Sequence, residues 1–405
     1  MAGLHVLVIG GGIGGLCLAH GLKQAGISVA VYERDTPTPT SDEGYSIQIN
    51  NWGHHALHDC LPPQVWDAYR RIMGPPVTGL RFVTEKMHSL LSVDWGAPTD
   101  PVDGDCRVSR VALLQILRSG LEAELHYARK LVRYARTADK VEAFFADGST
   151  ATGDVLVGAD GVGSVVRRQL LPQAHVRNLD IVGIGGRCRL DDETRPWLAP
   201  ELTQRMNVVL PPAGCGMFVT SFMRTSDAVA LKDHVFWALI ARFSELDDVQ
   251  RGDAKAFASG TVDNWHPLFR QMVAETEPCA VTAIPLQTAT PVAGWQTSNV
   301  TLLGDAIHTM TPLQGLGANT ALRDASVLCH ALTRVNAGQS GLLPALRDYE
   351  VAMRLYAFAA VRQSLQQTEM FVSNNRFART AFKAVLRTAA VFPPLKRRLF
   401  HPPAE

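Results

Sequence analysis

The chain has 405 residues, of which 46% are hydrophobic and 19% charged, and its formal net charge is +1 at neutral pH. These values are ordinary for a soluble globular protein with two structural regions, and the net charge provides no overall field for nucleic acid or a membrane. No uninterrupted apolar run of about 18 or more residues occurs, so we expect no integral membrane segment.

The cysteines and the N-terminal segment favour a cytoplasmic protein. The seven cysteines are scattered and form no C-x-x-C pair, which argues against a disulfide framework or a metal site and favours a reducing compartment. The apolar segment 6–18 lacks a basic leader and contains five glycines in a phosphate-loop pattern. We therefore do not interpret it as a signal peptide.

The first elements predict a dinucleotide-binding βαβ unit. We expect a strand over residues 4–9, a helix over 14–25 and a second strand over 28–32. The turn before the helix fits G-x-G-x-x-G, whose glycines let the backbone approach a pyrophosphate at the helix N-terminus. The glycines that fit are Gly10, Gly12 and Gly15.

An acidic residue completes this pattern. Glu33 follows the second strand, where its carboxylate can accept hydrogen bonds from ribose hydroxyls. Arg34 could indicate a 2′-phosphate on NADP, but the opening glycine pattern disfavours this. The pattern alone does not distinguish NAD from FAD.

The next segment predicts a helix and a hairpin. Leucines at helical spacing indicate a helix over 110–126, and an Asp-Gly pair between apolar runs at 141–146 and 154–157 indicates a hairpin turn. The second run ends at Asp160, whose local sequence is typical of an Asp-Gly turn with Ser164 as a helix N-cap.

Two β-rich blocks, at 77–95 and 179–291, interrupt these elements. The second structural region is therefore expected to be inserted rather than appended. The predicted strands of the second block are 179–190, 205–212, 216–224, 234–243 and 280–291.

The most informative segment is 301–325. It predicts a buried strand that ends at Asp305, a turn at Pro312, and a helix opened by Gly315, with Asn319 in its first turn. A carboxylate at a strand end accepts from hydroxyls, and free N–H groups at a helix start attract negative charge. The segment can therefore hold a phosphorylated, polyhydroxylated ligand, and the chain after it is predicted to be mostly helical.

With its motifs in this order along the sequence, the chain resembles the flavoprotein aromatic hydroxylase family. This is the p-hydroxybenzoate hydroxylase type of single-component FAD-dependent monooxygenase. The residues that carry the resemblance are the N-terminal glycines with Glu33, Gly158-Ala159-Asp160-Gly161 with Ser164 and Arg167, Val108-x-Arg110-x-x-Leu113, and Gly304-Asp305-Ala306 with His308, Pro312, Gly315, Gly317 and Asn319. Ile307 and Thr311 depart from the usual family residues and could reshape the pocket beside the flavin.

The resemblance implies an α/β fold with a Rossmann-type FAD-binding domain, an inserted β-sheet substrate domain and a helical C-terminus. The expected ranges are 1–76, 97–177 and 291–360 for the FAD-binding domain, 77–96 and 178–290 for the substrate domain, and 361–405 for the C-terminal helices. The residues implied to hold FAD are Gly10, Gly12, Gly15, Glu33, Arg34, Ser46, Arg110, Asp160, Asp305, Pro312, Gly315, Gly317, Ala318 and Asn319.

The resemblance also implies a reaction. NADH or NADPH would bind transiently and reduce FAD, dioxygen would add at the flavin C4a carbon, and the hydroperoxide would deliver one oxygen to an apolar aromatic or polycyclic small molecule. Hydroxylation is the expected outcome. Epoxidation, a Baeyer-Villiger-type insertion and a non-redox FAD-containing cyclase are the alternatives, and halogenation is disfavoured because W-x-W-x-I-P is absent.

Substrate residues are expected on the inserted sheet. Arg187 matches an arginine that family members often carry on its first strand, and a solvated or salt-bridged sheet arginine is the alternative. No tyrosine occurs between Arg136 and Asp348, so a phenol relay in this sheet cannot use tyrosine. His234 is a candidate replacement base, and a histidine on an edge strand is the alternative. The side chains that could line an apolar cleft or form ordinary core are Met206, Met217, Phe218, Phe222, Phe236 and Trp237.

The segment 376–400 has seven Lys or Arg residues and no acid. Arg376, Arg379, Lys383 and Arg387 recur at helical spacing, which predicts a helix that packs on the body with a solvated basic face. A peripheral contact of this helix with an anionic membrane or a partner is the alternative.

Overall fold

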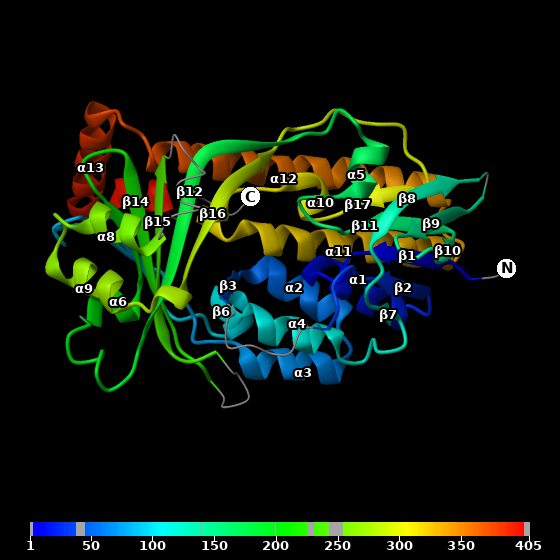
Figure 1. The fold of residues 1–405 in the computed structure, drawn as a ribbon, viewed down its shortest axis with the longest axis horizontal. Helices are drawn as coiled ribbons and strands as arrows, with labels where there is room; N and C mark the ends of the chain where they lie inside the picture. Colours follow the sequence, from blue (N-terminus) through cyan, green and yellow to red (C-terminus); the bar gives the residue numbers. More distant parts are fainter. Residues whose placement is uncertain are drawn as a thin grey trace.

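The structure is a computed structural model that describes residues 3–37, 45–137, 139–198, 200–225, 231–242 and 254–400. A parallel sheet at one end of the molecule and a larger mixed sheet at the other are joined by long helices (Figure 1). Parts of the expected domain ranges, including residues 1–2, 38–44, 243–253 and 401–405, lie outside the described residues.

The parallel sheet is built from short apolar strands that are buried on both faces. Its order is β17-β11-β1-β2-β7, and neighbouring strands pair in parallel. Strands of this kind read as continuous apolar runs because helices cover the sheet. The strands are β1 (His5–Ile9), β2 (Ser28–Tyr32), β7 (Leu125–His126), β11 (Val155–Gly158) and β17 (Val300–Leu302).

Helices cover this sheet and bury one large apolar core with it. The helix α11 packs on α1 and α2, and α4 packs on α1 and α3. These helices are α1 (Ile13–Gln24), α2 (Asn51–Cys60), α3 (Pro63–Ile72), α4 (Arg110–Arg118) and α11 (Leu316–Asn336), with the short α5 (Val165–Leu170) and α10 (Asp305–His308) beside the sheet. The expected βαβ unit is confirmed.

Two details of the middle segment differ from expectation. The helix expected over 110–126 is wrong at its end: it stops at Arg118 because Gly120, with φ of +80°, turns the chain into β7. The hairpin after Asp147 pairs β9 (Val141–Phe145) with β10 (Thr150–Gly153), whereas residues 155–158 form β11 in the parallel sheet. Strand β8 (Leu131–Arg136) completes this three-stranded sheet, and β3 (Ser46–Ile49) pairs separately with β6 (Cys106–Ser109).

The mixed sheet has the order β16-β12-β15-β14-β13-β4-β5, so all five strands expected in the second block are confirmed. One face packs on α8 (Ala254–Val262) and α9 (Pro267–Glu275) around buried Met217 and Trp237. The strands are β4 (Gly79–Thr84), β5 (Ser89–Asp94), β12 (Val176–Arg189), β13 (Met206–Leu210), β14 (Cys215–Phe222), β15 (His234–Arg242) and β16 (Val281–Ala289). The remaining short elements are α6 (Pro200–Gln204), η1 (Pro101–Asp103), η2 (Pro278–Ala280) and η3 (Pro312–Gln314).

The helix α12 (Leu342–Phe371) is continuous through the boundary expected at 360/361 and runs from the parallel-sheet side to the mixed sheet (Figure 1). At its end the Phe371 ring stacks on Phe218 of β14, with centroids 4.6 Å apart. The chain then forms α13 (Arg376–Val391) and α14 (Pro393–Phe400). No helix among the described residues combines the length and hydropathy needed to cross a membrane.

The expected basic face of α13 is solvated only in part, because Arg376 and Arg387 are exposed whereas Arg379 and Lys383 are not. Arg379 is buried, and its guanidinium donates to the carbonyl of Phe371 at the end of α12, where a cation is favoured. Lys383 is half-buried near Glu85, whereas Phe377 is 89% exposed. Two basic side chains therefore face the body, and an apolar ring faces outward.

Candidate functional site

The N-terminal glycines have different physical roles. A Cβ on Gly10, whose φ is +112°, would lie 2.3 Å from the carbonyl oxygen of Ala159, and a Cβ on Gly15 would lie 2.3 Å from the carbonyl oxygen of Gly10. A Cβ on Gly12 would meet nothing within 4 Å. Packing within the protein therefore requires glycine at positions 10 and 15, whereas Gly12 leaves open space at the start of α1.

That open space lies over unsatisfied donors. Gly12 is the N-cap of α1 and supplies no side-chain hydrogen bond to the free N–H groups of the first turn. An uncapped helix start attracts an anion because both the N–H groups and the helix dipole favour negative charge. This end of α1 fits a pyrophosphate.

The carboxylate of Glu33 lies beside the same loop. Its Oε2 accepts from the N–H of Gly11 at 2.7 Å, and its Oε1 accepts from the N–H of Asp35 at 3.0 Å. Each oxygen keeps a free lone pair that a ribose hydroxyl could use. The Nε of Arg34 is 3.4 Å from the Oδ1 of Asp35, and the side chains of both residues are largely exposed, so this ion pair lies on the surface.

Asp160 caps a helix and connects two distant motifs. Its Oδ2 accepts from the N–H groups of Val165 and Val166, and Ser164 caps α5 as expected. Its Oδ1 is enclosed without a hydrogen-bond partner among the described residues. From the same turn, Arg167 donates to the carbonyl of Ala306 at 2.8 Å, which ties this turn to the segment that begins at Gly304.

A buried aspartate that the sequence did not single out holds that segment. Asp324 of α11 accepts from the N–H of Gly304 at 2.8 Å, from His308 Nε2 at 2.6 Å and from Tyr356 Oη at 2.6 Å. Burial alone would lower the pKa of His308, but the Asp324 carboxylate and its hydrogen bond outweigh burial and raise that pKa. His308 is therefore structural, as expected. Asp324 could not be identified from the sequence because the burial of this acid on α11 becomes visible only in the structure.

Asp305 begins the short helix α10, shortly after the buried strand β17. Its side chain is accessible to solvent, yet the protein around it raises its pKa by desolvation, opposed by the charges of His308 and Arg110. Arg110 begins α4 and lies over the ring of Tyr45, 5.6 Å from its centroid. The structure thus brings Arg110 and Asp305 within electrostatic range, although 195 positions separate them in the sequence.

The start of α11 is a second uncapped helix N-terminus. Gly315 is its N-cap in the left-handed region, with φ of 63°, and gives no side-chain hydrogen bond. Asn319 fixes this turn because its Nδ2 donates to the carbonyls of Gln48 and Gly315, and its Oδ1 accepts from the N–H of Asn50. Both amide hydrogens of Asn319 are thereby used within the protein. Pro312 is exposed, and Gly317 and Ala318 are half-exposed on the same turn.

The helices α1 and α11 pack together, so two helix starts and the Glu33 and Asp305 carboxylates belong to one region. This arrangement can hold one long ligand with phosphates and hydroxyls. It fits FAD in its donors, acceptors and free space.

Arg187 and His234 lie on one face of the mixed sheet. The strand register pairs Arg187 with Phe236 and His234 with Phe222, and places Thr220 opposite Phe236 on the same face. Arg187 and Phe236 are half-exposed. This is the face on which Phe218 and Leu313 of η3 pack, so it is directed toward the Pro312 turn.

His234 has properties that differ from those of an exposed base. β15 lies between β12 and β14, so the alternative of an edge-strand histidine is wrong. The ring is 3% exposed, and its Nδ1 is 2.8 Å from the carbonyl of Lys232. Burial lowers its pKa to about 4, with smaller contributions from the charges of Arg187 and Arg107. It is therefore neutral and weakly basic near pH 7.

The apolar residues of the sheet divide between core and cleft. Met217 and Trp237 are fully buried on the opposite face, and Phe222 is buried in the core of the parallel-sheet region. Met206 and Phe236 are half-exposed.

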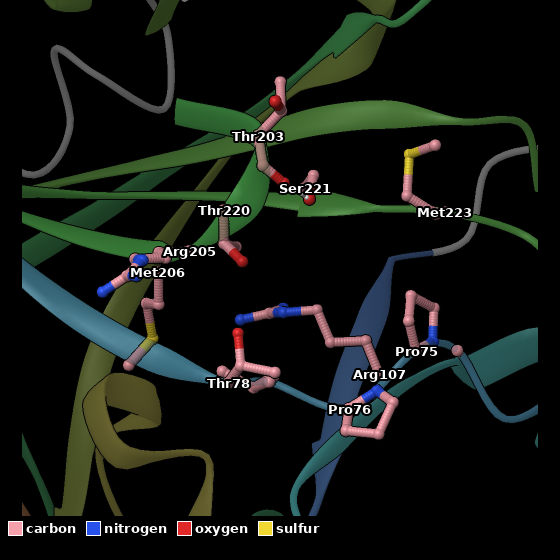
Figure 2. A pocket seen from close by; sticks show the side chains of 12 residues that line it. Pro75, Pro76, Thr78, Arg107, Thr203, Arg205, Met206, Thr220, Ser221 and Met223 are labelled. Atoms are coloured by element: carbon pink, nitrogen blue, oxygen red, sulfur yellow. Dashed lines mark hydrogen bonds between the residues drawn. The ribbon is translucent and has the colours of Figure 1, made fainter. Parts of the chain in front are cut away.

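A cavity of about 410 Å³ separates the end of this sheet face from β6. Figure 2 shows the Arg107 side chain extending into it from β6, between Thr78 and Thr220. Sequence reasoning missed Arg107 because nothing local marks it. The lining residues are Gly74, Pro75, Pro76, Val77, Thr78, Arg107, Thr203, Arg205, Met206, Thr220, Ser221 and Met223.

Comparison with known proteins identifies relatives over most of the chain. A family model described as an FAD binding domain matches residues 106–364, and one described as an NAD(P)-binding Rossmann-like domain matches residues 8–72. The chain is 30% identical to the FAD-dependent monooxygenase dbaB of Emericella nidulans, over 84% of this chain and 89% of that protein.

Two further relatives differ in how much of their length is matched. The chain is 34% identical to a proposed FAD-containing monooxygenase from Photorhabdus luminescens, whose crystal structure superposes with a TM-score of 0.84 over 91% of this chain and 98% of that one. It is 28% identical to the dual O-methyltransferase/FAD-dependent monooxygenase CTB3 of Cercospora beticola, over 91% of this chain and 46% of that protein. The chain thus spans about half the length of the first curated relatives it matches.

Proposed function

The chain belongs to the FAD binding domain family that its residues 106–364 match, and from this premise we propose that it is an FAD-dependent monooxygenase that hydroxylates an apolar aromatic or polycyclic small molecule. Bound FAD supplies the redox chemistry and the activation of dioxygen, and the protein supplies binding, orientation and exclusion of water. The cavity between β6 and the mixed sheet is the single observation that carries the proposal.

We assign the cofactor contacts from the geometry of the loop and the helices. The N–H groups behind Gly12 bind the pyrophosphate, and Glu33 accepts from the adenosine ribose. Asp305 and Arg110 bind in the middle of the cofactor, and the Gly315 turn of α11 meets the flavin end. The uncapped starts of α1 and α11 support this assignment because each leaves donors for a ligand.

The substrate assignment follows from the sheet face directed toward the Pro312 turn. Phe236 and Met206 offer apolar surface there, and Arg187 carries a charge on the same face. Small-molecule sites typically combine apolar walls with a few polar groups, in volumes of about 300–1,000 Å³. His234 does not act as the base in this proposal because it is enclosed and has a low pKa.

The decisive experiment measures turnover and product together. We expect the purified FAD-loaded protein to consume NADH or NADPH and oxygen faster when an aromatic substrate is added, and the product to gain one ¹⁸O atom from labelled dioxygen. An epoxide or a ring-inserted ester would identify an alternative oxygenation. Turnover that is unchanged by flavin reduction would instead support a non-redox cyclase. The proposed cofactor contacts at Asp305 and at the helix starts do not favour that alternative.

The reductant is proposed to bind transiently. The sequence contains no second G-x-G-x-x-G, so we expect NADH or NADPH to approach the flavin without a dedicated Rossmann site. We propose a reducing compartment such as the cytoplasm because the seven cysteines are scattered, odd in number and form no C-x-x-C pair.

The C-terminal helices support a further proposed contact, with an anionic lipid surface. Phe377 is 89% exposed and Val391 is 81% exposed, and segment 376–400 contains no acid. Apolar side chains among cations are typical of helices that lie at a membrane surface. We expect co-sedimentation with vesicles that contain phosphatidylserine and none with phosphatidylcholine alone. Equal binding to both vesicle types would contradict the proposed role of charge.

A further inference from the structure

The cavity has one strongly basic wall. The Arg107 guanidinium extends into it between Thr78 and Thr220 (Figure 2). Its hydrogen bond from Nη1 to the Oγ of Ser46 is 3.5 Å long, which is the outer limit for such a bond, and its Nε is enclosed without a partner among the described residues. Among the described ranges, no carboxylate forms an ion pair with this guanidinium.

The charge of Arg107 is only partly balanced by its neighbours. Asp105 acts on it electrostatically, but the Asp105 Oδ2 is occupied by the Nε2 of Gln48 at 2.5 Å, and burial raises the pKa of Asp105. Burial lowers the pKa of Arg107 to about 10, so the guanidinium remains protonated near pH 7. A cation that lines a cavity with unused donors is stabilised by an anion that accepts from it.

The rest of the lining has no competing acid. Arg205 lies at the same cavity and pairs with Asp94, with Nη1 2.5 Å from Oδ1. Hydroxyls of threonine and serine and the side chains of Met206 and Met223 complete the wall. The lining therefore offers one unpaired cation, neutral hydrogen-bonding groups and apolar surface.

We propose that Arg107 binds a carboxylate of the substrate and thereby selects acidic aromatic molecules. The inference rests on the proposed function, in which this cavity is the substrate site. The apolar wall of Met206 and Met223 contacts the rings, and the threonine hydroxyls contact further oxygens. Arg107 belongs to β6, which pairs with β3 in a sheet separate from the mixed sheet. It therefore orients the acid from the wall of the cavity that lies opposite the mixed sheet.

The test compares matched acids and amides with the FAD-loaded protein. The probes are benzoate, 1-hydroxy-2-naphthoate and anthracene-2-carboxylate, each with its neutral carboxamide. Binding is measured from the change in the flavin absorbance spectrum without any reductant, so the result does not depend on turnover. We expect at least one acid to bind about tenfold or more tightly than its amide, which is the size of one charge-assisted hydrogen bond.

Variants assign this preference to a residue. Arg107→Gln should remove most of the difference between acid and amide, because Arg187 on the sheet face can supply only a smaller part, and Arg107→Lys should keep more of it because the charge remains. Arg205→Gln is the matched control and should retain the preference because Arg205 is already paired with Asp94. Flavin content and thermal midpoint are measured for each variant, and the Lys variant keeps the test valid if the Gln variant does not fold.

Three outcomes would overturn the inference. They are the absence of an acid preference in the unaltered protein for all three pairs, its persistence in Arg107→Gln, and its loss in Arg205→Gln. A selective loss of NADPH over NADH use in Arg107→Gln would also overturn it, because Arg107 would then bind a nucleotide phosphate. The proposed function fails separately, if no aromatic substrate stimulates NAD(P)H oxidation.

Discussion

Substitution of Gly12 by alanine or valine separates cofactor binding from folding. The backbone of Gly12, with φ of −80° and ψ of −178°, is open to any residue, and its added Cβ would meet no protein atom within 4 Å. We therefore expect the free energy of unfolding of the apoprotein to change by no more than about 1 kcal/mol, since the loss of a glycine N-cap and the reduced entropy of the unfolded chain oppose each other.

FAD binding should respond much more strongly. A methyl group at this position holds a pyrophosphate oxygen away from the free N–H groups of α1, and one hydrogen bond to a charged group contributes about 1.5–3 kcal/mol. The dissociation constant of FAD should rise by about 10- to 150-fold for Gly12→Ala. It should rise further for Gly12→Val because the side chain is larger.

The assay is titration of apoprotein with FAD, followed by quenching of flavin fluorescence, with urea unfolding of the apoprotein in parallel. Gly260→Ala is the matched control because its Cβ also meets nothing within 4 Å, on α8 beyond the mixed sheet, and FAD affinity should not change. Gly10→Ala is the opposite control. Its Cβ overlaps the Ala159 carbonyl at a positive φ, so it should cost about 3 kcal/mol or more of stability.

Unchanged FAD affinity in Gly12→Ala would refute the reasoning about the open helix start. A Gly10→Ala protein as stable as the unaltered one would refute the assigned packing of the loop. Both results can be read without knowledge of the substrate.

Three other predictions concern titratable or charged side chains that are buried or lie on the mixed-sheet face. Burial lowers the pKa of His54 and of His234 from 6.5 to about 4. As pH falls, these histidines therefore become protonated in the unfolded state before they do so in the folded state. Each histidine should thereby lower the free energy of unfolding by about 2 kcal/mol between pH 7.5 and 5. His234→Asn should remove one such contribution from the pH dependence of urea unfolding, and an unchanged slope would contradict it. Asp324→Asn should destabilise the protein by about 3–5 kcal/mol by breaking a buried charge network, whereas Tyr356→Phe, which removes one hydrogen bond, should cost about 1 kcal/mol in the same unfolding assay. Arg187→Gln should raise the KM for an acidic substrate severalfold at unchanged FAD affinity, and steady-state kinetics with a flavin titration would show whether only one of the two changes.

Much of the fold was predictable because the relevant signals are local. The glycine turn, the apolar strands on either side of it and Glu33 lie within the first 33 residues, and each constrains the backbone directly. The β-rich texture of 179–291 likewise reflects alternating and β-branched residues, which form β12 to β16. Errors arose where a tertiary contact decides the outcome, as at Gly120, which ends α4 so that residues 125–126 can join the parallel sheet.

The orientation of α13 shows the same limit. Its cations and apolar residues alternate at helical spacing, and helical periodicity identifies two faces without saying which one is buried. The carbonyl of Phe371, at the end of the preceding helix, decides the matter by accepting from Arg379. A cation that satisfies a helix C-terminus can be buried, so Arg379 lies on the buried side of α13 with Leu386 and Ala389, and Phe377 is left outside.

The candidate site depends on two buried charged side chains whose partners could not be predicted from the sequence. Arg167 belongs to the Asp160 motif, whereas Asp324 belongs to none. Arg167 links the Asp160 turn to Ala306, and Asp324 holds Gly304 in place from α11. Both bind backbone groups, which any sequence provides, so neither partner could be identified from residue types. Because these two contacts fix the position of Asp305 relative to the glycine loop, loss of either one should disturb cofactor binding without touching a proposed cofactor contact. The precision of the site therefore depends on buried ionic groups that support it, whereas Gly12 leaves the open space and Gly10 and Gly15 permit the close packing of the loop.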